Sequence, residues 1–272
     1  MYQTQYHRPT SVEEAARIFS EAGDAAYLSG GHTLLPAMKL RLSAPGNLID
    51  LRHVGELKGI SVGPDEVTIG AGMTHAEVAG SADVKGAIPA LAELAGSIGD
   101  AHVRHLGTIG GSVANNDPAA DYPSAVLALA GTVHTNRRSV AADEYFTGLY
   151  ETVLQEGEIL TKVTFRIPET AAYAKFRNPA SRYPMAGVFV ARHRDGSIRV
   201  AVTGAGNSGV FRVPAMEQAL ASDFSADAIK DVRVDPAGMM GDIHGSSEYR
   251  AHLVNVMARR AVQNPGRALA FV

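Results

Sequence analysis

The stretch that decides the fold is DAHVRHLGTIGGSVANNDPAADYP, residues 100–123. Its centre, Gly107-Thr108-Ile109-Gly110-Gly111-Ser112, places glycines where backbone N–H groups can approach an anion without obstruction by Cβ atoms. The hydroxyls of Thr108 and Ser112 would add two further donors. We therefore interpret this stretch as part of a site for a phosphorylated ligand.

A second loop of the same kind lies earlier in the chain. Ser29-Gly30-Gly31-His32-Thr33 follows a short apolar segment, Ala25-Ala26-Tyr27-Leu28, that predicts a buried strand. By itself this loop fits a tight strand-to-helix turn at least as well as an anion site, and a single histidine is more typical of a loop side chain bonded to nearby backbone. Two such loops in one small protein indicate one long ligand with a diphosphate and a ribose.

Asp121, downstream of the second loop, has two interpretations. Its carboxylate can accept hydrogen bonds from ribose hydroxyls, as in dinucleotide sites generally. It also directly precedes Tyr122-Pro123 and an expected helix, which is the usual position of an N-cap. The two roles are compatible, and the sequence leaves both open.

Composition excludes several classes of function. With 272 residues, of which 46% are hydrophobic, the chain is long enough for two or three modules. A formal net charge of −3 argues against nucleic acid as a partner. There is no cysteine, so the chain supplies no thiolate for an iron–sulfur cluster. The start has no leader-like pattern and no stretch is apolar enough to cross a membrane, so we expect a cytoplasmic protein without a transmembrane segment.

Two further motifs carry weaker signals. Gly204-Ala205-Gly206-Asn207-Ser208-Gly209 matches the G-x-G-x-x-G dinucleotide pattern, but the residues that follow it read as extended, so we interpret it as a turn. His102 and His105 are spaced for a metal, yet no third ligand accompanies them. We expect no metal site.

Periodicity and caps predict the elements. We expect helices at 12–22, 88–97, 122–130, 215–221, 225–231 and 247–262, strands at 25–28, 47–51, 158–167, 185–192 and 198–203, and a hairpin over 60–69. Ser11 with Glu14, and Thr74 with Glu77, form capping boxes that open the helices following them.

Five segments, taken in order, resemble the medium FAD-binding subunit of the carbon monoxide dehydrogenase and xanthine dehydrogenase family of molybdenum hydroxylases. They are SGGHTLLPAMKLRL (29–42), LIDL (48–51), IGAGMTH (69–75), GDAHVRHLGTIGGSVANNDPAADYP (99–123) and KFRNPASRYPMAGV (175–188). The resemblance covers nearly the whole chain. It implies an α+β protein whose FAD-binding fold, of the vanillyl-alcohol-oxidase (PCMH) type, has two subdomains, 1–56 and 57–168. A C-terminal α+β domain, 169–272, would hold a three-stranded antiparallel sheet with helices.

The resemblance also implies roles for individual residues. The FAD pyrophosphate would be held by the two glycine loops, comprising Ser29, Gly30, Gly31, His32, Thr33, Thr108, Ile109, Gly110, Gly111 and Ser112. Asp121 would bind the adenosine ribose. Ile98 stands where relatives carry an aromatic residue beside the flavin, so stacking by this residue is impossible here. Lys175 or Arg177 would lie near the N1–C2=O edge of the flavin, and Tyr183 near its ring.

The implied function is electron transfer. Non-covalent FAD would collect electrons from iron–sulfur clusters on a small partner subunit, while a large subunit carries the molybdenum–pterin group. The three chains would form a heterotrimer that could dimerise, free in the cytoplasm or held at the inner membrane by the complex. No catalytic residue is expected on this chain. The sequence names neither the substrate (carbon monoxide, a purine or an N-heteroaromatic) nor the terminal acceptor.

Two alternatives remain open at this point. One is a self-contained FAD-dependent oxidase, although the last hundred residues look small for a substrate domain and show no base. The other is a nucleotide-binding module without redox chemistry, which the glycine loops alone would permit.

Overall fold

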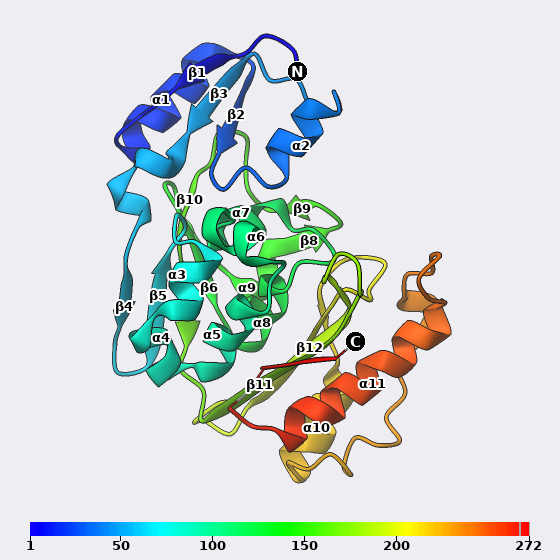
Figure 1. Ribbon diagram of the computed structural model, residues 1–272. Helices are drawn as coiled ribbons and strands as arrows, with labels where there is room; N and C mark the ends of the chain where they lie inside the picture. Colours follow the sequence, from blue (N-terminus) through cyan, green and yellow to red (C-terminus); the bar gives the residue numbers. More distant parts are fainter. Residues whose placement is uncertain (267, 272) are drawn as a thin grey trace.

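The computed structural model describes residues 1–266 and 268–271 of the chain. Figure 1 shows three lobes that follow one another along the chain, with the N-terminal lobe at the top and the C-terminal sheet and its long helix at the lower right. Each lobe is built around its own sheet. Within the described residues, no helix combines the length and the apolar composition needed to cross a membrane.

The N-terminal lobe is a small parallel sheet with helices. Its strands are β1 (Gln5–His7), β2 (Ala25–Leu28) and β3 (Asn47–Asp50), in the order β1-β3-β2, and its helices are α1 (Val12–Ala22) and α2 (Leu34–Lys39). The Ser11 side chain accepts from the amide of Glu14, and Gly23 ends α1 with a φ of 70°. Two 3₁₀ turns, η1 (Leu51–His53) and η2 (Gly55–Leu57), lead into the next lobe.

The second lobe packs helices against an antiparallel sheet. Its strands are β4 (Ile60–Val62), β5 (Glu66–Gly70), β10 (Leu160–Arg166), β6 (Thr132–Thr135) and β7 (Ser139–Ala141), in this order across the sheet. Its helices are α3 (His75–Gly80), α4 (Ala82–Ala87), α5 (Pro89–Gly96), α6 (Ala101–Leu106), α7 (Ile109–Asn115), α8 (Tyr122–Ala128) and α9 (Ala142–Tyr145). A short pair, β8 (Phe146–Gly148) and β9 (Glu151–Thr152), stands apart. Thr74 and Glu77 form the expected capping box at the start of α3.

The C-terminal lobe has a sheet that is buried on both faces. Its strands are β11 (Thr170–Arg177), β12 (Pro184–Arg192), β13 (Ile198–Thr203), β14 (Phe211–Arg212) and β15 (Ala268–Phe271). Helices α10 (Pro214–Ser222) and α11 (Ser247–Gln263) and the turn η3 (Pro236–Gly238) complete it. Because side chains alternate along a strand, Tyr173 and Phe189 join the core of the second lobe while Ala172 and Val188 pack in the core that α11 covers. The sheet is therefore shared between two cores.

The structure corrects two expectations for this lobe. The sheet has five strands rather than three, because β14 pairs with β13 at one edge and β15 lies parallel to β11 at the other. Residues 225–231 form turns instead of the expected helix, and Asn255 of α11 donates to the carbonyl oxygens of Ile229 and Val232. The Gly204–Gly209 segment is confirmed as a turn, because the strand β14 rather than a helix is the next element.

Candidate functional site

The two glycine loops meet in space. The Ser29 hydroxyl oxygen lies 2.9 Å from that of Thr108, so the end of β2 is hydrogen-bonded to the start of α7. Gly30 packs directly on the backbone before the second loop, where an added Cβ would lie 2.7 Å from the Cα of Gly107 and closer still to the carbonyl oxygen of Leu106. Real Cβ atoms do not approach so closely, so only glycine at position 30 permits this contact.

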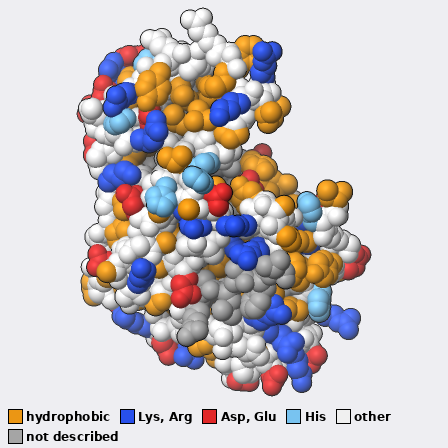
Figure 2. Space-filling model, viewed as in Figure 1, with side chains coloured by type: hydrophobic (Ala, Val, Ile, Leu, Met, Phe, Trp, Pro, Cys, Tyr) orange, Lys and Arg blue, Asp and Glu red, His pale blue; other side chains and the backbone are white. Residues whose placement is uncertain are grey.

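The joined loops line one cleft of about 560 Å³. Twelve residues expected at the site line it, namely Ser29, Gly30, Gly31, His32, Thr33, Ile98, Thr108, Gly110, Gly111, Ser112, Asp121 and Tyr183. Apolar side chains from the N-terminal lobe and from the start of β10 line it too, among them Leu28, Leu57 and Leu160. In Figure 2 hydrophobic side chains gather on the N-terminal lobe, and histidine and basic side chains lie below them.

The two loops differ in the hydrogen-bond donors they offer. In the first loop, the amides of Gly30, Gly31, His32 and Thr33 have no acceptor within the described part of the chain. Gly31 has a φ of 75°, which turns the backbone sharply at this point. A run of unpaired amides around a left-handed residue is the geometry of an anion-binding nest.

In the second loop the amides of Ile109, Gly110 and Gly111 are occupied, contrary to our expectation. Ile109 donates to the oxygen of Met73 at 3.0 Å, Gly110 to that of Ala71 at 2.9 Å, and Gly111 to the hydroxyl of Thr108 at 3.0 Å. An added Cβ at Gly110 would meet Ala71 at 2.5 Å. Gly110 therefore serves close packing at the start of α7, and the side-chain polar groups that the loop presents are the hydroxyls of Thr108 and Ser112.

Asp121 is fixed from behind the cleft. Its Oδ1 accepts from Lys175 Nζ at 2.8 Å and from Tyr173 Oη at 2.6 Å. Asp121 occupies the N-cap position of α8 as expected, but its backbone angles are helical and its side chain makes no capping bond. Both donors come from β11, which draws the carboxylate inward.

Three expected site residues do not line the cleft. Ile109 is fully buried in the core of the second lobe. Lys175 is fully buried, and its ammonium bonds Asp121 and the carbonyl oxygen of Ser97. Arg177 lies at the end of β11 and is absent from the lining as well. Neither Lys175 nor Arg177 lines the cleft, so the cleft lining does not support a position for either cation at a flavin edge.

A turn that carries Ile98 is held by cations. The carbonyl oxygen of Ser97 accepts from Lys175, those of Ile98 and Gly99 accept from Arg104 at 2.9 and 3.0 Å, and Gly99 also accepts from Arg182 at 3.3 Å. The last bond joins the second lobe to the loop that bears Tyr183. Ile98 and Tyr183 therefore line a part of the cleft whose backbone is surrounded by positive charge.

His75 is a lining residue that sequence reasoning missed. It is 5% exposed, and its ring lies 5.4 Å from that of Tyr122. Burial, with smaller contributions from His32 and Arg104, lowers the pKa of His75 from 6.5 to about 4, so the ring is neutral at pH 7. The capping box fixed the start of α3 in the sequence, but nothing there indicated that His75 would face the second glycine loop.

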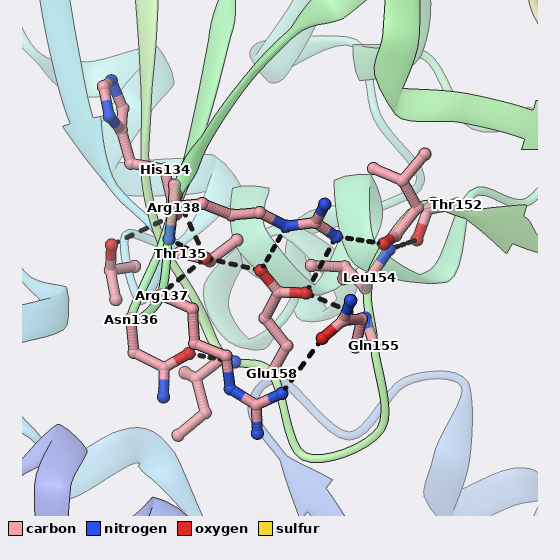
Figure 3. A network of polar contacts seen from close by, with 12 residues as sticks. His134, Thr135, Asn136, Arg137, Arg138, Thr152, Leu154, Gln155 and Glu158 are labelled. Carbon is pink, nitrogen blue, oxygen red and sulfur yellow. Dashed lines mark hydrogen bonds and ion pairs between the residues drawn. The ribbon is translucent and has the colours of Figure 1, made fainter.

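Glu158 is the second missed residue, and Figure 3 shows its network. Its carboxylate accepts from Thr135 at 2.7 Å, from the Gln155 amide at 2.8 Å and from Arg138 at 3.1 and 3.2 Å. Burial raises the pKa of Glu158, but the bonds from Arg138, Gln155 and Thr135 outweigh this effect and lower it to about 2. The network holds residues 154–160, four of which line the cleft, against the β6–β7 hairpin.

The two histidines of α6 lie on the surface of the second lobe. His102 and His105 are exposed, and a ring nitrogen of His105 is hydrogen-bonded to the oxygen of Ala101 at 2.7 Å. No group of three potential metal ligands was found across residues 1–266 and 268–271.

Comparison with known proteins gives consistent matches. Residues 2–170 match the family model described as the FAD binding domain in molybdopterin dehydrogenase. The carbon monoxide dehydrogenase medium chain of Hydrogenophaga pseudoflava is 34% identical, with 95% of each chain covered. The nicotine 6-hydroxylase medium subunit of Paenarthrobacter nicotinovorans is 35% identical, with 96% of this chain and 97% of that protein covered.

Solved structures agree with the sequence matches. The reconstituted carbon monoxide dehydrogenase from Oligotropha carboxidovorans superimposes with a TM-score of 0.87 at 32% identity, covering 97% of this chain and 98% of that one. Quinoline 2-oxidoreductase from Pseudomonas putida 86 gives a TM-score of 0.87 at 27% identity, with 96% of each chain covered.

Proposed function

The chain belongs to the family of FAD-binding domains in molybdopterin dehydrogenases, as a medium subunit of the molybdenum hydroxylase type, and on that premise we propose that its cleft holds FAD non-covalently. The observation that carries the placement is the contact between Ser29 and Thr108, which brings both glycine loops to one cavity. The pyrophosphate would bind at the unpaired amides of Gly30–Thr33, and the hydroxyl of Ser112 would contact it from the second loop.

The lining also suggests how the two ends of FAD are divided. The flat faces of adenine can pack on apolar side chains, which suits the leucines of the N-terminal lobe, whereas Ile98 and Tyr183 would contact the isoalloxazine. Reduction places negative charge on the isoalloxazine, and Arg104 and Arg182 donate to the backbone beside it. This charge would favour the reduced cofactor.

The role of the chain would be to connect one-electron carriers with a two-electron acceptor. When bound, FAD accepts electrons singly or in pairs and so links one-electron carriers to a two-electron acceptor. This chain has no cysteine, so it supplies no thiolate for an iron–sulfur cluster. We place the clusters on a small partner subunit and the molybdenum–pterin group on a large one. The related proteins named above act on carbon monoxide and nicotine, and we place the choice of substrate on the large subunit.

Titration of the purified chain with FAD tests this proposal. We expect saturable binding of one FAD, with a yellow protein and quenched flavin fluorescence. As a control, Gly55→Ala should bind FAD like the wild-type chain, since an added Cβ there meets nothing within 4 Å and lies outside the cleft. A colourless protein that takes up no FAD under any condition of reconstitution would remove the proposal.

A further inference from the structure

The ring of His75 is fixed beside the point where the two glycine loops meet. Its backbone amide donates to the carbonyl oxygen of Gly107 at 2.9 Å, and an added Cβ at Gly107 would lie 2.6 Å from Nε2 of the ring. Gly30 packs on the same residue, because its own added Cβ would lie 2.7 Å from the Cα of Gly107. One residue therefore contacts both the His75 ring and the loop whose amides are unpaired.

The imidazole of His75 has no hydrogen-bond partner among residues 1–266 and 268–271. Its Nδ1 is buried and unpartnered, and no described residue bonds Nε2, although the side chain is only 5% exposed. Buried polar groups in native proteins are almost always paired with protein, water or ligand atoms. Because His75 lines the cleft, a ligand in the cleft can supply an acceptor to the ring.

The groups that face His75 make its surroundings positive. His32 of the first loop and Arg104 of α6 are the charged groups that act on the ring, and no carboxylate of the described chain offsets them. Tyr122 faces the ring from α8, and its hydroxyl is buried without a partner as well. Burial and the two basic side chains keep the pKa of His75 near 4. An anion brought close to the ring would favour its protonated form instead.

The second glycine loop offers few backbone donors to such an anion. Its amides at Ile109, Gly110 and Gly111 are already bonded, and the Thr108 hydroxyl is shared with Ser29 and with the amide of Gly111. Side chains must therefore supply much of the donation from this side of the cleft. An imidazole N–H is a donor in the neutral and in the protonated ring, and in the protonated ring it also carries charge.

From this geometry, and resting on the proposed function, we infer that His75 is a further anion-binding residue of the cleft, which donates from Nε2 to the diphosphate and takes up a proton when the diphosphate binds. The proton comes from solvent and remains on the ring while the anion is bound, so no bond of the ligand forms or breaks. Affinity for a diphosphate therefore rises as the pH falls, because the complex binds a proton that the free chain does not.

Calorimetric titrations of the full chain between pH 5 and 8 test the inference. FAD and ADP-ribose serve as ligands, because a diphosphate esterified at both ends keeps its charge over this range. One proton taken up changes the affinity by at most about 10-fold per pH unit, and we expect an increase of about 3-fold or more for each unit by which the pH falls below 7. Repeating each titration in buffers of different ionisation enthalpy measures the proton uptake directly.

Three variants assign the proton to one histidine. His75→Gln keeps a polar side chain but takes up no proton, so its affinity should change little with pH. His32→Gln removes the exposed histidine of the first loop and should leave proton uptake in place. His105→Gln removes an exposed histidine outside the cleft and should behave like the wild type. Because His32 is exposed, its variant keeps the test open where His75→Gln fails to fold.

Two outcomes would overturn the inference while leaving the proposed function intact. One is FAD binding whose proton uptake disappears in His32→Gln, which would assign the linkage to the exposed histidine. The other is a folded His75→Gln chain with the same pH dependence as the wild type. A wild-type chain that binds ADP-ribose with proton uptake but takes up no FAD would instead refute the proposed function alone. A chain that binds neither ligand would refute both.

Discussion

Gly30→Ala gives the sharpest test of how the cleft is formed. The added methyl group would lie 2.7 Å from the Cα of Gly107, below the roughly 3.0 Å at which real Cβ contacts begin, and closer still to the oxygen of Leu106. Both neighbours are backbone, so they cannot rotate away as a side chain could. The two loops must separate, and the 2.9 Å bond between Ser29 and Thr108 must lengthen with them.

The magnitude follows from two losses. Overpacking against a rigid neighbour costs about 1–3 kcal/mol, and a lost neutral hydrogen bond costs about 1 kcal/mol. For a chain of this size roughly 2–4 °C of Tm accompanies each kcal/mol, so we expect the Tm of the apo protein to fall by roughly 5–15 °C. FAD affinity should fall as well, because we propose that both loops contribute to the pyrophosphate site.

The assay is thermal unfolding with and without FAD, combined with a fluorescence titration. Ser29→Ala removes only the hydroxyl and should lose about 1 kcal/mol. Gly55→Ala, with open space around its new methyl group, should change neither Tm nor affinity. If Gly30→Ala kept the wild-type Tm and bound FAD normally, the two loops would not be in the contact on which the site depends.

Three further predictions concern other parts of the cleft wall. The pKa of Glu158 is lowered to about 2 from 4.5, so its bonds stabilise the fold above about pH 4.5 and lose this effect as pH falls toward 2. Denaturation curves should therefore show that Glu158→Gln lowers the free energy of unfolding most at pH 7 and differs little from the wild type near pH 2. A loss of the same size at all pH values would contradict this. The pKa of His75 is lowered to about 4 from 6.5, so protonation favours the unfolded chain and stability falls between pH 6.5 and 4. His75→Gln should flatten that slope, and an unchanged slope measured by urea denaturation at pH 4.5 and 7 would assign it to other groups. At Gly111 an added Cβ meets only the Thr108 hydroxyl, at 3.0 Å, so Gly111→Ala should keep the apo Tm within a few degrees yet weaken FAD in a titration; a large loss of Tm would show that this glycine serves packing alone.

Much of the fold was predictable from local signals. The cap at Ser11 and the glycine at 23 set both ends of α1, and the alternation over 158–167 marked β10, because these patterns act over a few residues. The α+β FAD-binding fold implied by the resemblance is confirmed by the family and structure matches. The strands β1 and β15 were not predicted, since each has only three or four residues and exists through pairing with a distant strand.

For the candidate site, too, local features could be predicted from the sequence, whereas those that depend on distant residues could not. By itself the sequence determined that two glycine-rich turns and no thiol are present, which indicated a phosphorylated ligand and left any iron–sulfur cluster to a partner. Only the tertiary structure decided that the first loop keeps its amides free while the second uses them, and that Asp121 pairs with Lys175. Those partners are 54 residues apart, and Lys175 reaches Ser97 across 78. Local sequence fixes the backbone conformation of a loop, whereas the packing of distant elements decides which of its polar groups remain for a ligand.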